Sequence, residues 1–333
     1  MTDTAKIVRF NEFGSPGVMK IVTEPLAVPK EGEVRVRVHA IGLNRADINF
    51  RRGQYLWKPE LPARLGVEAA GVVDAIGPGC SEDWIGKRVL TLPTFSPADY
   101  GVYGESAIVP VTSIAEFPDG VSFIDAAASF AQYVTGWGAL IHKGKLAKGD
   151  YVLLTAASSS IGIAAIQMIK DRGGISIATT RSPQKAQQLL DLGADHVIVD
   201  GPEDLVARVM DITGGAGARI VYDTIAGESL EQMVRAAARG ALILEAGVLS
   251  DRPTVIPMME AFPKDLMITV YSIYPLLEDP AVLEQALDYL FGKLGSGALK
   301  PVISKVFPLE EIVQAHEYLE GGTQVGKIVV VTK

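Results

Sequence analysis

The pattern of hydrophobic and polar positions divides the chain into two kinds of sequence. Over the first 125 residues the apolar positions form short runs, and in EVRVRVHAIGL (33–43) apolar and polar residues alternate. A period of two is typical of strands with one buried face. Further strands are predicted at 69–77 and 87–92, with a turn at 77–79 between them. This part of the chain is therefore expected to be rich in β-structure.

A different rhythm begins near residue 150, where apolar, β-branched runs alternate with helical stretches. The runs are 151–154, 175–179, 196–199, 219–223, 241–246 and 266–271, and the predicted helices are 161–172, 183–192, 203–213 and 228–238. Strands that alternate with helices of this length predict right-handed parallel βαβ units. Six such strands fit a doubly wound parallel sheet of the α/β class.

The last part of the chain is predicted to hold a helix at 281–294 and, after residue 299, two strands around one more helix. No long linker lies near this segment, so we expect its strands to rejoin the N-terminal domain. The predicted domains are 1–127 together with 302–333, and 128–301 between them.

The stretch AASSSIG (156–162) lies where the first strand of the α/β part turns into a helix. A dinucleotide-binding turn carries glycines here, because the backbone comes close to a pyrophosphate that faces the helix N-terminus. Ser159 and Ser160 stand in place of glycines, while Gly162 keeps the position that packs helix against strand. Two interpretations stay open, a cofactor site and an ordinary structural turn, and the βαβ context favours the first.

The end of the second predicted strand bears on which dinucleotide is bound. An NAD site carries an acid about 20 residues beyond the glycines, which holds the ribose hydroxyls. Here Thr180 stands in that region, followed by Arg181, Ser182 and Lys185. Cations without an acid suit a 2′-phosphate through charge-assisted hydrogen bonds, so the sequence favours NADPH. The alternative is a solvated helix start with two surface cations.

Composition restricts the partners and the compartment. The formal net charge of −8 argues against nucleic acid or an anionic membrane as the main partner. The first twenty residues hold no continuous apolar core, and no apolar span is long enough to cross a bilayer comfortably. We therefore expect neither a secretory signal nor a membrane helix. A single cysteine, Cys80, suits a reducing compartment, and a cytoplasmic enzyme is expected.

Five segments, in order along the chain, resemble one family: GLNRADINFRRGQY (42–55), LGVEAAGVVDAIGPG (65–79), AQYVTGWGAL (131–140), AASSSIG (156–162) and GKIVV (326–330). The chain is similar over essentially its full length to the medium-chain dehydrogenase/reductase family, in its zinc-free quinone oxidoreductase branch. The resemblance implies a GroES-like catalytic domain that is interrupted by a Rossmann domain, and a homodimer.

Alcohol dehydrogenases of this family hold a catalytic zinc with Cys and His. In this chain the matching stretch GLNRAD has no cysteine, and Val67 stands where a zinc-ligating His would fall. One cysteine also excludes a structural zinc lobe of four cysteines. The histidines are scattered, and we expect each on the surface of a strand or helix: His39, His142, His196 and His316. No metal site is predicted.

The resemblance also implies the site residues. Asn44 and Tyr55 would donate hydrogen bonds to the substrate oxygen, although Asn44 with Asp47 fits a turn cap equally and Tyr55 fits a packed ring. Asp200, where close relatives often carry a tyrosine, would oppose a 2′-phosphate if it faced one. The implied cofactor contacts are Tyr133, Thr135, Ser159, Ser160, Ile161, Gly162, Thr180, Arg181, Ser182, Lys185, Thr224, Ala246, Gly247, Val248, Tyr271 and Ser272.

Without a metal to polarise an oxygen, an already electron-poor substrate is favoured. We therefore expect a zinc-independent, NADPH-dependent reductase of a quinone, an enone or another α,β-unsaturated carbonyl. Two alternatives stay open. One is an enoyl-thioester reductase, whose cleft accepts a pantetheine arm; the other is a cofactor-binding dimer without significant turnover, with a structural or regulatory role.

Overall fold

The computed structural model describes residues 4–332, and the chain forms two compact units. We call the part through Ala131 together with the segment from Asp288 onward the β-rich unit, and Gln132–Leu287 the parallel-sheet unit. The chain thus changes unit at 131/132 and 287/288, whereas the sequence predicts domain limits at 127/128 and 301/302. The limits of the folding domains stay predictions.

Each unit contains both strands and helices. The strands are β1 Thr4–Phe10, β2 Met19–Pro25, β3 Glu33–Gly42, β4 Ala69–Ile76, β5 Arg88–Thr91, β6 Ser106–Pro110, β7 Ile114–Glu116, β8 Tyr151–Leu154, β9 Ile175–Thr180, β10 His196–Val199, β11 Ala218–Asp223, β12 Ala237–Glu245, β13 Met267–Val270, β14 Ile303–Pro308 and β15 Lys327–Val331. The α-helices are α1 Arg45–Arg51, α2 Phe123–Ala127, α3 Phe130–Gly136, α4 Ser160–Arg172, α5 Pro183–Asp191, α6 Leu205–Ile212, α7 Ser229–Ala236, α8 Met258–Ala261, α9 Tyr274–Leu277, α10 Pro280–Gly295 and α11 Ile312–Gly321. A π-helical segment, Trp137–Lys143, follows α3.

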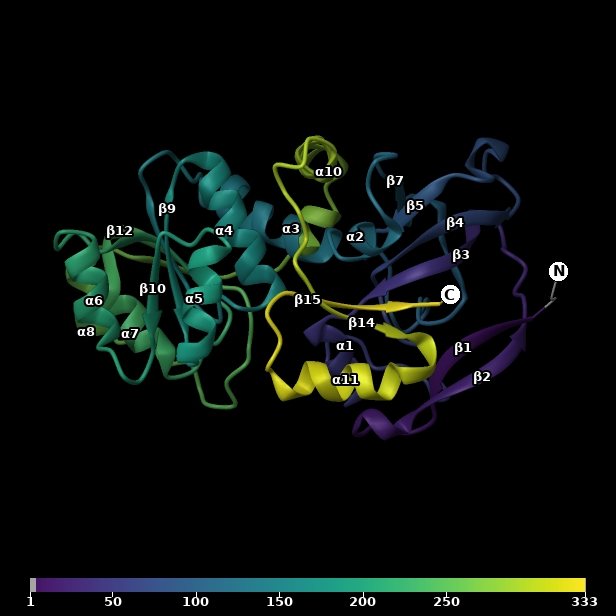
Figure 1. Ribbon diagram of the computed structural model, residues 1–333, viewed down its shortest axis with the longest axis horizontal. Helices are drawn as coiled ribbons and strands as arrows, with labels where there is room; N and C mark the ends of the chain where they lie inside the picture. Colours follow the sequence, from purple (N-terminus) through teal and green to yellow (C-terminus); the bar gives the residue numbers. More distant parts are fainter. Residues whose placement is uncertain (1–3, 333) are drawn as a thin grey trace. The chain divides into compact units, whose positions relative to one another are not determined.

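The parallel-sheet unit is built around strands in the order β10-β9-β8-β11-β12-β13, all parallel to their neighbours. The chain winds outward from β8 to β10 and from β11 to β13, as in a doubly wound sheet. Helices α4 and α5 pack on one face, and α6, α7 and α8 pack on the other (Figure 1). The α/β fold predicted for this part of the chain is confirmed.

Buried side chains alternate between the two faces along the central strands of this sheet. Leu242 and Leu244 of β12 lie in the core that α4 covers, whereas Ile243 lies in the core of α6 and α7. Both faces of such a strand are buried beneath helices. This explains why the strands of this unit are continuous apolar runs in the sequence.

The β-rich unit holds a sheet in the order β14-β15-β3-β4-β5-β7, with β6 also paired to β3. Val34, Val36 and Val38 of β3 are buried, and Arg35 and Arg37 between them are not, which is the predicted alternation. β14 and β15 are parallel to each other, and β15 is antiparallel to β3. The C-terminal strands therefore rejoin the N-terminal domain, as predicted.

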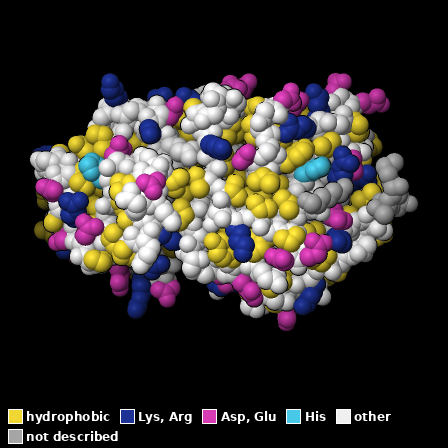
Figure 2. All heavy atoms as spheres, viewed as in Figure 1, with side chains coloured by type: hydrophobic (Ala, Val, Ile, Leu, Met, Phe, Trp, Pro, Cys, Tyr) yellow, Lys and Arg dark blue, Asp and Glu magenta, His cyan; other side chains and the backbone are white. Residues whose placement is uncertain are grey.

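The surface carries charges of both signs. Lys and Arg side chains are interspersed with Asp and Glu over the face that Figure 2 shows. Charges that alternate in this way screen one another and do not form a band of one sign on that face. Within residues 4–332 no helix is long and apolar enough to span a membrane.

Candidate functional site

The cofactor residues implied for the parallel-sheet unit gather at one edge of its sheet. Because all its strands are parallel, the segments that follow β8, β9, β11, β12 and β13 leave from the same, carboxyl edge. The strand ends and the segments after them carry Ser159, Thr180, Thr224, Ala246 and Ser272, in that order. In doubly wound sheets, ligands bind at this edge where the strand order reverses. Here that point lies between β8 and β11.

The serine turn is a helix start with little bulk. Ser159 is the N-cap of α4, and its Oγ accepts a hydrogen bond from the Gly162 N–H at 3.1 Å. A Cβ on Gly162 would lie 2.5 Å from both Cα and O of Ala157, so a larger residue does not fit unless the turn moves. Ala156 has a φ of +45°, in the left-handed region that glycine favours. Gly162 therefore lets the helix approach the turn closely.

The first turn of α4 fits a dinucleotide pyrophosphate. Ser160 and Ile161 begin the helix and are partly exposed. The N–H groups of a first helical turn lack intrahelical partners, and the helix dipole attracts anions there. The turn thus combines a positive potential with a backbone that a phosphate group can approach.

The start of α5 brings two cations to the same turn. Lys185 Nζ donates to Ser158 Oγ at 3.4 Å. Burial and the neighbouring Arg181 guanidinium lower the pKa of Lys185, and an anion between two such cations would be stabilised by both. Thr180 is buried and accepts from the Ser182 N–H at 3.2 Å. Arg181 is exposed, and Ser182 and Lys185 are partly exposed.

Buried polar atoms lie at the ends of β11 and β12. The Thr224 side chain is buried, and its Oγ1 has no hydrogen-bond partner among the described residues. A Cβ on Gly247 would lie 2.6 Å from the Thr224 carbonyl oxygen, so these two segments are in close contact. Ala246 N donates to Asp223 O, and Val248 is exposed. An unpaired buried hydroxyl such as that of Thr224 is the kind of group that a ligand or an ordered water satisfies.

Two tyrosines implied as cofactor contacts hold helix α3 with their hydroxyls. Tyr271 OH donates to the Thr135 carbonyl oxygen at 2.9 Å, and Tyr133 OH donates to Gln167 Oε1 on α4 at 2.8 Å. A Cβ on Gly138, in the π-helical segment, would lie 2.2 Å from the Tyr271 hydroxyl oxygen. π-helical turns are frequent at functional sites. These contacts fix the position of Thr135, the residue implied to lie beside the nicotinamide.

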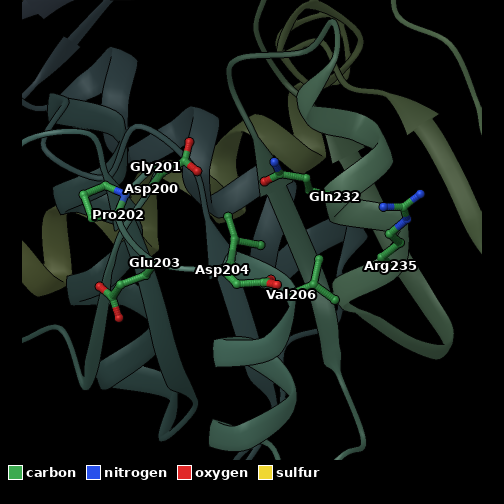
Figure 3. Close-up of a pocket in the computed structure, with 9 residues that line it drawn as sticks. Asp200, Gly201, Pro202, Glu203, Asp204, Val206, Gln232 and Arg235 are labelled. Atoms are coloured by element: carbon green, nitrogen blue, oxygen red, sulfur yellow. The ribbon is translucent and has the colours of Figure 1, made fainter.

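A pocket of about 440 Å³ opens beside α6 and α7. It is lined by Asp200, Gly201, Pro202, Glu203, Asp204, Leu205, Val206, Gln232 and Arg235 (Figure 3). Two of its charged groups have partners of their own, since Glu203 accepts from the Val199 N–H and Arg235 pairs with Glu260. Asp200 thus lines a pocket on the face that α6 and α7 cover, whereas α5, which follows Arg181, packs on the opposite face.

An acidic pair at the ends of β11 and β12 was not predicted. Asp223 and Glu245 are register partners on neighbouring strands, and both are buried. Asp223 accepts from Thr155 Oγ1, Ser229 Oγ and the Ile225 N–H, whereas neither carboxyl oxygen of Glu245 has a partner among residues 4–332. Burial, and then the Asp223 charge, raise the pKa of Glu245 to about 7. The sequence feature that could have indicated this pair is an acidic residue at the end of each of two apolar strands.

In the β-rich unit, Asn44 lies where three strand ends meet. β3 is antiparallel to β4 and β15, so its carboxyl end lies beside their amino ends, and this brings Asn44, Glu68 and Lys327 together. Lys327 Nζ donates to Glu68 Oε2 at 2.6 Å and to Asn44 Oδ1 at 2.7 Å. Asn44 Nδ2 donates to Glu68 Oε2 at 3.0 Å and to Gly42 O at 3.2 Å. Sequence reasoning missed Glu68 and Lys327, although both lie in the quoted family segments.

Asn44 is also the N-cap of α1. The Asp47 carboxylate accepts from the Asn44 backbone N–H at 2.8 Å and from Tyr103 OH at 2.9 Å. Burial raises the pKa of Asp47 to about 6. The turn cap predicted for Asn44 and Asp47 is therefore present, and it uses the backbone N–H of Asn44. The Asn44 side chain makes other contacts.

His316 corrects the expectation that every histidine lies on the surface. It is fully buried on α11, with Nε2 3.3 Å from Tyr103 OH and Nδ1 3.0 Å from Arg51 Nη1. A guanidinium only donates, so Nδ1 accepts and Nε2 carries the hydrogen that Tyr103 receives. Burial and Arg51 lower the pKa of His316 to about 3, which keeps the ring neutral. The histidine is buried because partners distant in sequence satisfy both ring nitrogens.

Tyr55 lies in the loop after α1. Its ring packs beside Trp57, with ring centroids 5.7 Å apart, and contacts the core of the β-rich unit. The side chain is partly exposed, so both a packed ring and a hydrogen-bond donor are compatible with its place. Val67 packs against the same core. Within the described part of the chain, no three His, Cys, Asp or Glu side chains are grouped as metal ligands.

Known proteins resemble this chain over nearly its whole length. The family description "Alcohol dehydrogenase GroES-like domain" matches residues 30–145, and "Zinc-binding dehydrogenase" matches residues 192–330. A quinone oxidoreductase of Salmonella typhimurium is 33% identical over 97% of this chain and 98% of its own length, and that of Homo sapiens is 30% identical over 98% and 97%. The crystal structure of Escherichia coli quinone oxidoreductase complexed with NADPH has a TM-score of 0.91 at 32% identity, and the match covers 98% of this chain and 100% of that one.

The fold, the strand-end site and this similarity define the class of protein. The chain belongs to the medium-chain dehydrogenase/reductase family, in its quinone oxidoreductase branch. It is an oxidoreductase, and the expected combination of a GroES-like domain with a Rossmann domain is confirmed.

Replacing Gly162 with valine should weaken NADPH binding roughly 10- to 100-fold, because the added side chain overlaps Ala157 and moves the turn. Fluorescence titration measures the affinity. Lys170→Val, at an exposed position of the same helix, controls for the low helix propensity of valine. Unchanged affinity in a folded Gly162→Val variant would mean that the cofactor binds elsewhere.

Glu245→Gln should change how stability depends on pH. The ordinary pKa of this carboxyl is 4.5 and its folded-state pKa is about 7, so the folded chain retains a proton that the unfolded chain loses between these values. The free energy of unfolding therefore falls as pH rises from about 4.5 to about 7, by at most about 3 kcal/mol. Glu245→Gln has no ionisable carboxyl at this position, so its free energy of unfolding does not fall for this reason.

Urea unfolding at pH 5 and pH 8 tests the Glu245 prediction. Between pH 5 and pH 8 the free energy of unfolding of the wild type should fall by about 1–3 kcal/mol more than that of Glu245→Gln. Glu228→Gln, at an exposed position, is the control. Identical pH slopes for Glu245→Gln and the wild type would show that Glu245 is ionised at neutral pH.

Proposed function

We propose that the protein is a zinc-independent, NADPH-dependent reductase that transfers a hydride to a quinone, an enone or another α,β-unsaturated carbonyl. The observation that carries the proposal is the start of α4, where Gly162 lies against Ala157 and Lys185 of α5 donates to Ser158 in the turn. Full-length similarity to quinone oxidoreductases, one of them solved with NADPH, supports it. These comparisons favour this activity over an enoyl-thioester reductase and over a cofactor-binding dimer without turnover.

NADPH is proposed to lie along the carboxyl edge of the parallel sheet, where it would supply the hydride. The residues proposed to hold it are Ser159, Ser160, Ile161 and Gly162 at the pyrophosphate, Thr180, Arg181, Ser182 and Lys185 at the 2′-phosphate, and Tyr133, Thr135, Thr224, Ala246, Gly247, Val248, Tyr271 and Ser272 at the nicotinamide half. The unpaired Thr224 Oγ1 and the neighbouring cations Arg181 and Lys185 support this assignment. The roles of the chain are to bind, to orient and to exclude water.

The proposed oxygen site consists of Asn44 and Tyr55. A quinone or enone oxygen gains negative charge during reduction, and hydrogen-bond donors stabilise that charge. The Asn44 Nδ2 group makes its longer bond, 3.2 Å, to the neutral Gly42 carbonyl, and this is the bond that a charged substrate oxygen would replace. A phenol is a weak acid at neutral pH, so we propose solvent as the proton source.

Zinc independence is proposed from the donor set. Val67 stands where the family's zinc-binding members carry a His ligand, and Cys80 is the single cysteine of the sequence. Elemental analysis of the purified protein should find no stoichiometric zinc, and chelators should leave turnover intact. One tightly bound equivalent whose removal abolished turnover would contradict the proposal.

We also propose a homodimer formed through β13, the edge strand of the parallel sheet. Its Met267 and Val270 are 60% and 82% exposed, and the connection from β12 exposes Val255, Met259 and Phe262 as well. A second copy that pairs with this edge would extend the sheet and bury the apolar side chains. Sedimentation equilibrium measures the mass, and Val270→Asp should yield monomers; a monomeric wild type would contradict the proposal.

The proposed partner is a small electrophilic molecule in the cytoplasm. A net charge of −8 and the interspersed surface charges of Figure 2 do not favour nucleic acid. The single cysteine suits a reducing compartment, and cell fractionation tests the location.

The direct test of function is NADPH oxidation with a panel of quinones, enones and enoyl thioesters, followed at the NADPH absorbance band. A quinone or enone reductase consumes NADPH in proportion to these substrates. A protein that melts at a higher temperature with NADPH but consumes none would be a binding protein. Turnover confined to thioesters would identify the enoyl-thioester reductase.

Arg181→Ala should weaken NADPH binding roughly 10- to 100-fold, because a charge-assisted hydrogen bond to the 2′-phosphate contributes about 1.5–3 kcal/mol. NADH binding should hardly change, since NADH lacks that phosphate. Titrations with both dinucleotides measure the difference, and Arg172→Ala, at the far end of α4, is the control. Equal losses for both dinucleotides would show that Arg181 shapes the turn and does not bind the phosphate.

Tyr55→Phe should lower the turnover rate with an enone roughly tenfold and leave NADPH affinity intact, because one donor to the substrate oxygen is lost and water replaces it in part. Steady-state kinetics and NADPH titration separate the two effects. Abolished turnover would make Tyr55 an essential acid. If Tyr55→Phe and Asn44→Ala both keep full activity, the proposed oxygen site is wrong.

A further inference from the structure

The buried pair Lys327 and Glu68 lies next to Asn44 but is shielded from any substrate. Both charged side chains are 1% exposed, whereas Asn44 is partly exposed. A Cβ on Gly42 would lie 2.9 Å from Glu68 Oε2 and 3.0 Å from Lys327 Cε, so the pair packs directly against the backbone that leads to Asn44. Asn44 is therefore the group through which the pair acts on a ligand.

The chemistry of the two ions determines which way the Asn44 amide points. The oxygen and nitrogen of an amide have nearly the same shape, so packing does not distinguish its two orientations. An ammonium only donates and a carboxylate only accepts. Lys327 requires Oδ1, at 2.7 Å, and Glu68 requires Nδ2, at 3.0 Å. The reversed amide would face donor with donor and acceptor with acceptor.

Glu68 is itself held by a backbone group. Its Oε1 accepts from the Ala131 N–H in the first turn of α3 at 2.9 Å, while Oε2 receives both Lys327 and Asn44. Each carboxylate oxygen thus has fixed donors, and rotation of the group would break these bonds. Glu68 is a rigid reference for the Asn44 amide.

We propose that Lys327 and Glu68 are positioning residues that orient the Asn44 amide, so that Asn44 offers a donor and not an acceptor to the substrate oxygen. The inference rests on the proposed function of Asn44 at the oxygen site. An oxygen that gains negative charge is stabilised by a donor and repelled by an acceptor. The pair therefore sets the polarity of the site without touching the substrate.

The test reverses the amide without removing it. In Lys327→Met/Glu68→Gln, the side-chain oxygen at position 68 still accepts from the Ala131 N–H, and the side-chain amino group faces Asn44. Asn44 must then turn its Oδ1 toward that amino group, which reverses its amide. Neutral groups of similar size replace the buried ion pair, a change that proteins tolerate. We expect kcat with a quinone to fall roughly 10- to 100-fold, with the Kd for NADPH within about twofold of the wild type.

Asn44→Ala in both backgrounds completes the cycle. If the pair acts through Asn44, then Asn44→Ala lowers kcat in the wild type and causes no further loss in the double variant. Arg9→Met/Glu24→Gln removes another ion pair of the β-rich unit and should leave kcat unchanged. A merely structural role of Lys327 and Glu68 would lower kcat and NADPH affinity together, and its losses would add to that of Asn44→Ala.

The outcomes separate the two proposals. Full activity of Asn44→Ala would remove Asn44 from the proposed oxygen site and would refute the inference with it. A loss in Asn44→Ala with wild-type kcat in Lys327→Met/Glu68→Gln would overturn the inference alone. Asn44→Asp is a second test of the inference if Lys327→Met/Glu68→Gln does not fold. It keeps the size of the side chain and replaces the donor by an acceptor. Its kcat should be at or below that of Asn44→Ala, and a wild-type kcat would overturn the inference.

Discussion

A charge buried away from water needs a partner, and in the β-rich unit this requirement ties the end of the chain to its beginning. Lys327 and Glu68 are 259 positions apart in sequence, and Lys327 Nζ donates a hydrogen bond to Glu68 Oε2 at 2.6 Å. Either ion left alone there would destabilise the fold by several kcal/mol. The register that pairs β15 with β3 brings the first residue of β15 to Glu68. The same register sets the surroundings of Asn44, so closure of the sheet and geometry of the site depend on one contact.

Both units place their polar residues at strand ends, by different geometry. In the parallel-sheet unit every strand runs the same way, so the segments after β8, β9, β11, β12 and β13 share one edge. In the β-rich unit β3 is antiparallel to both β4 and β15, so the end of β3 meets their starts. Side chains in the middle of a strand pack in the core, so the groups that can bind ligands lie at the strand ends.

Hydrogen bonding separates the buried acids of the molecule. Asp223 accepts from several donors, whereas Glu245, its neighbour on the next strand, has none among the described residues and a pKa near 7. Asp47 is intermediate: it accepts from Tyr103 and the Asn44 N–H, and burial still raises its pKa to about 6. Donors stabilise the ionised carboxylate and burial opposes it. Burial therefore raises the pKa values of Asp47 and Glu245 toward neutral pH.

The sequence by itself determined the elements and the class of fold. Runs such as 241–246 are apolar because helices cover both faces of the sheet, and 33–43 alternates because β3 has one buried face; both patterns are local and can be read from neighbouring positions. The serine turn was also readable, since Gly162 is needed by the strand and helix that adjoin it. The tertiary structure alone decided the partners of buried polar groups. His316, Lys327 and Glu68 find theirs across long stretches of chain, and no local pattern specifies a contact between residues that far apart.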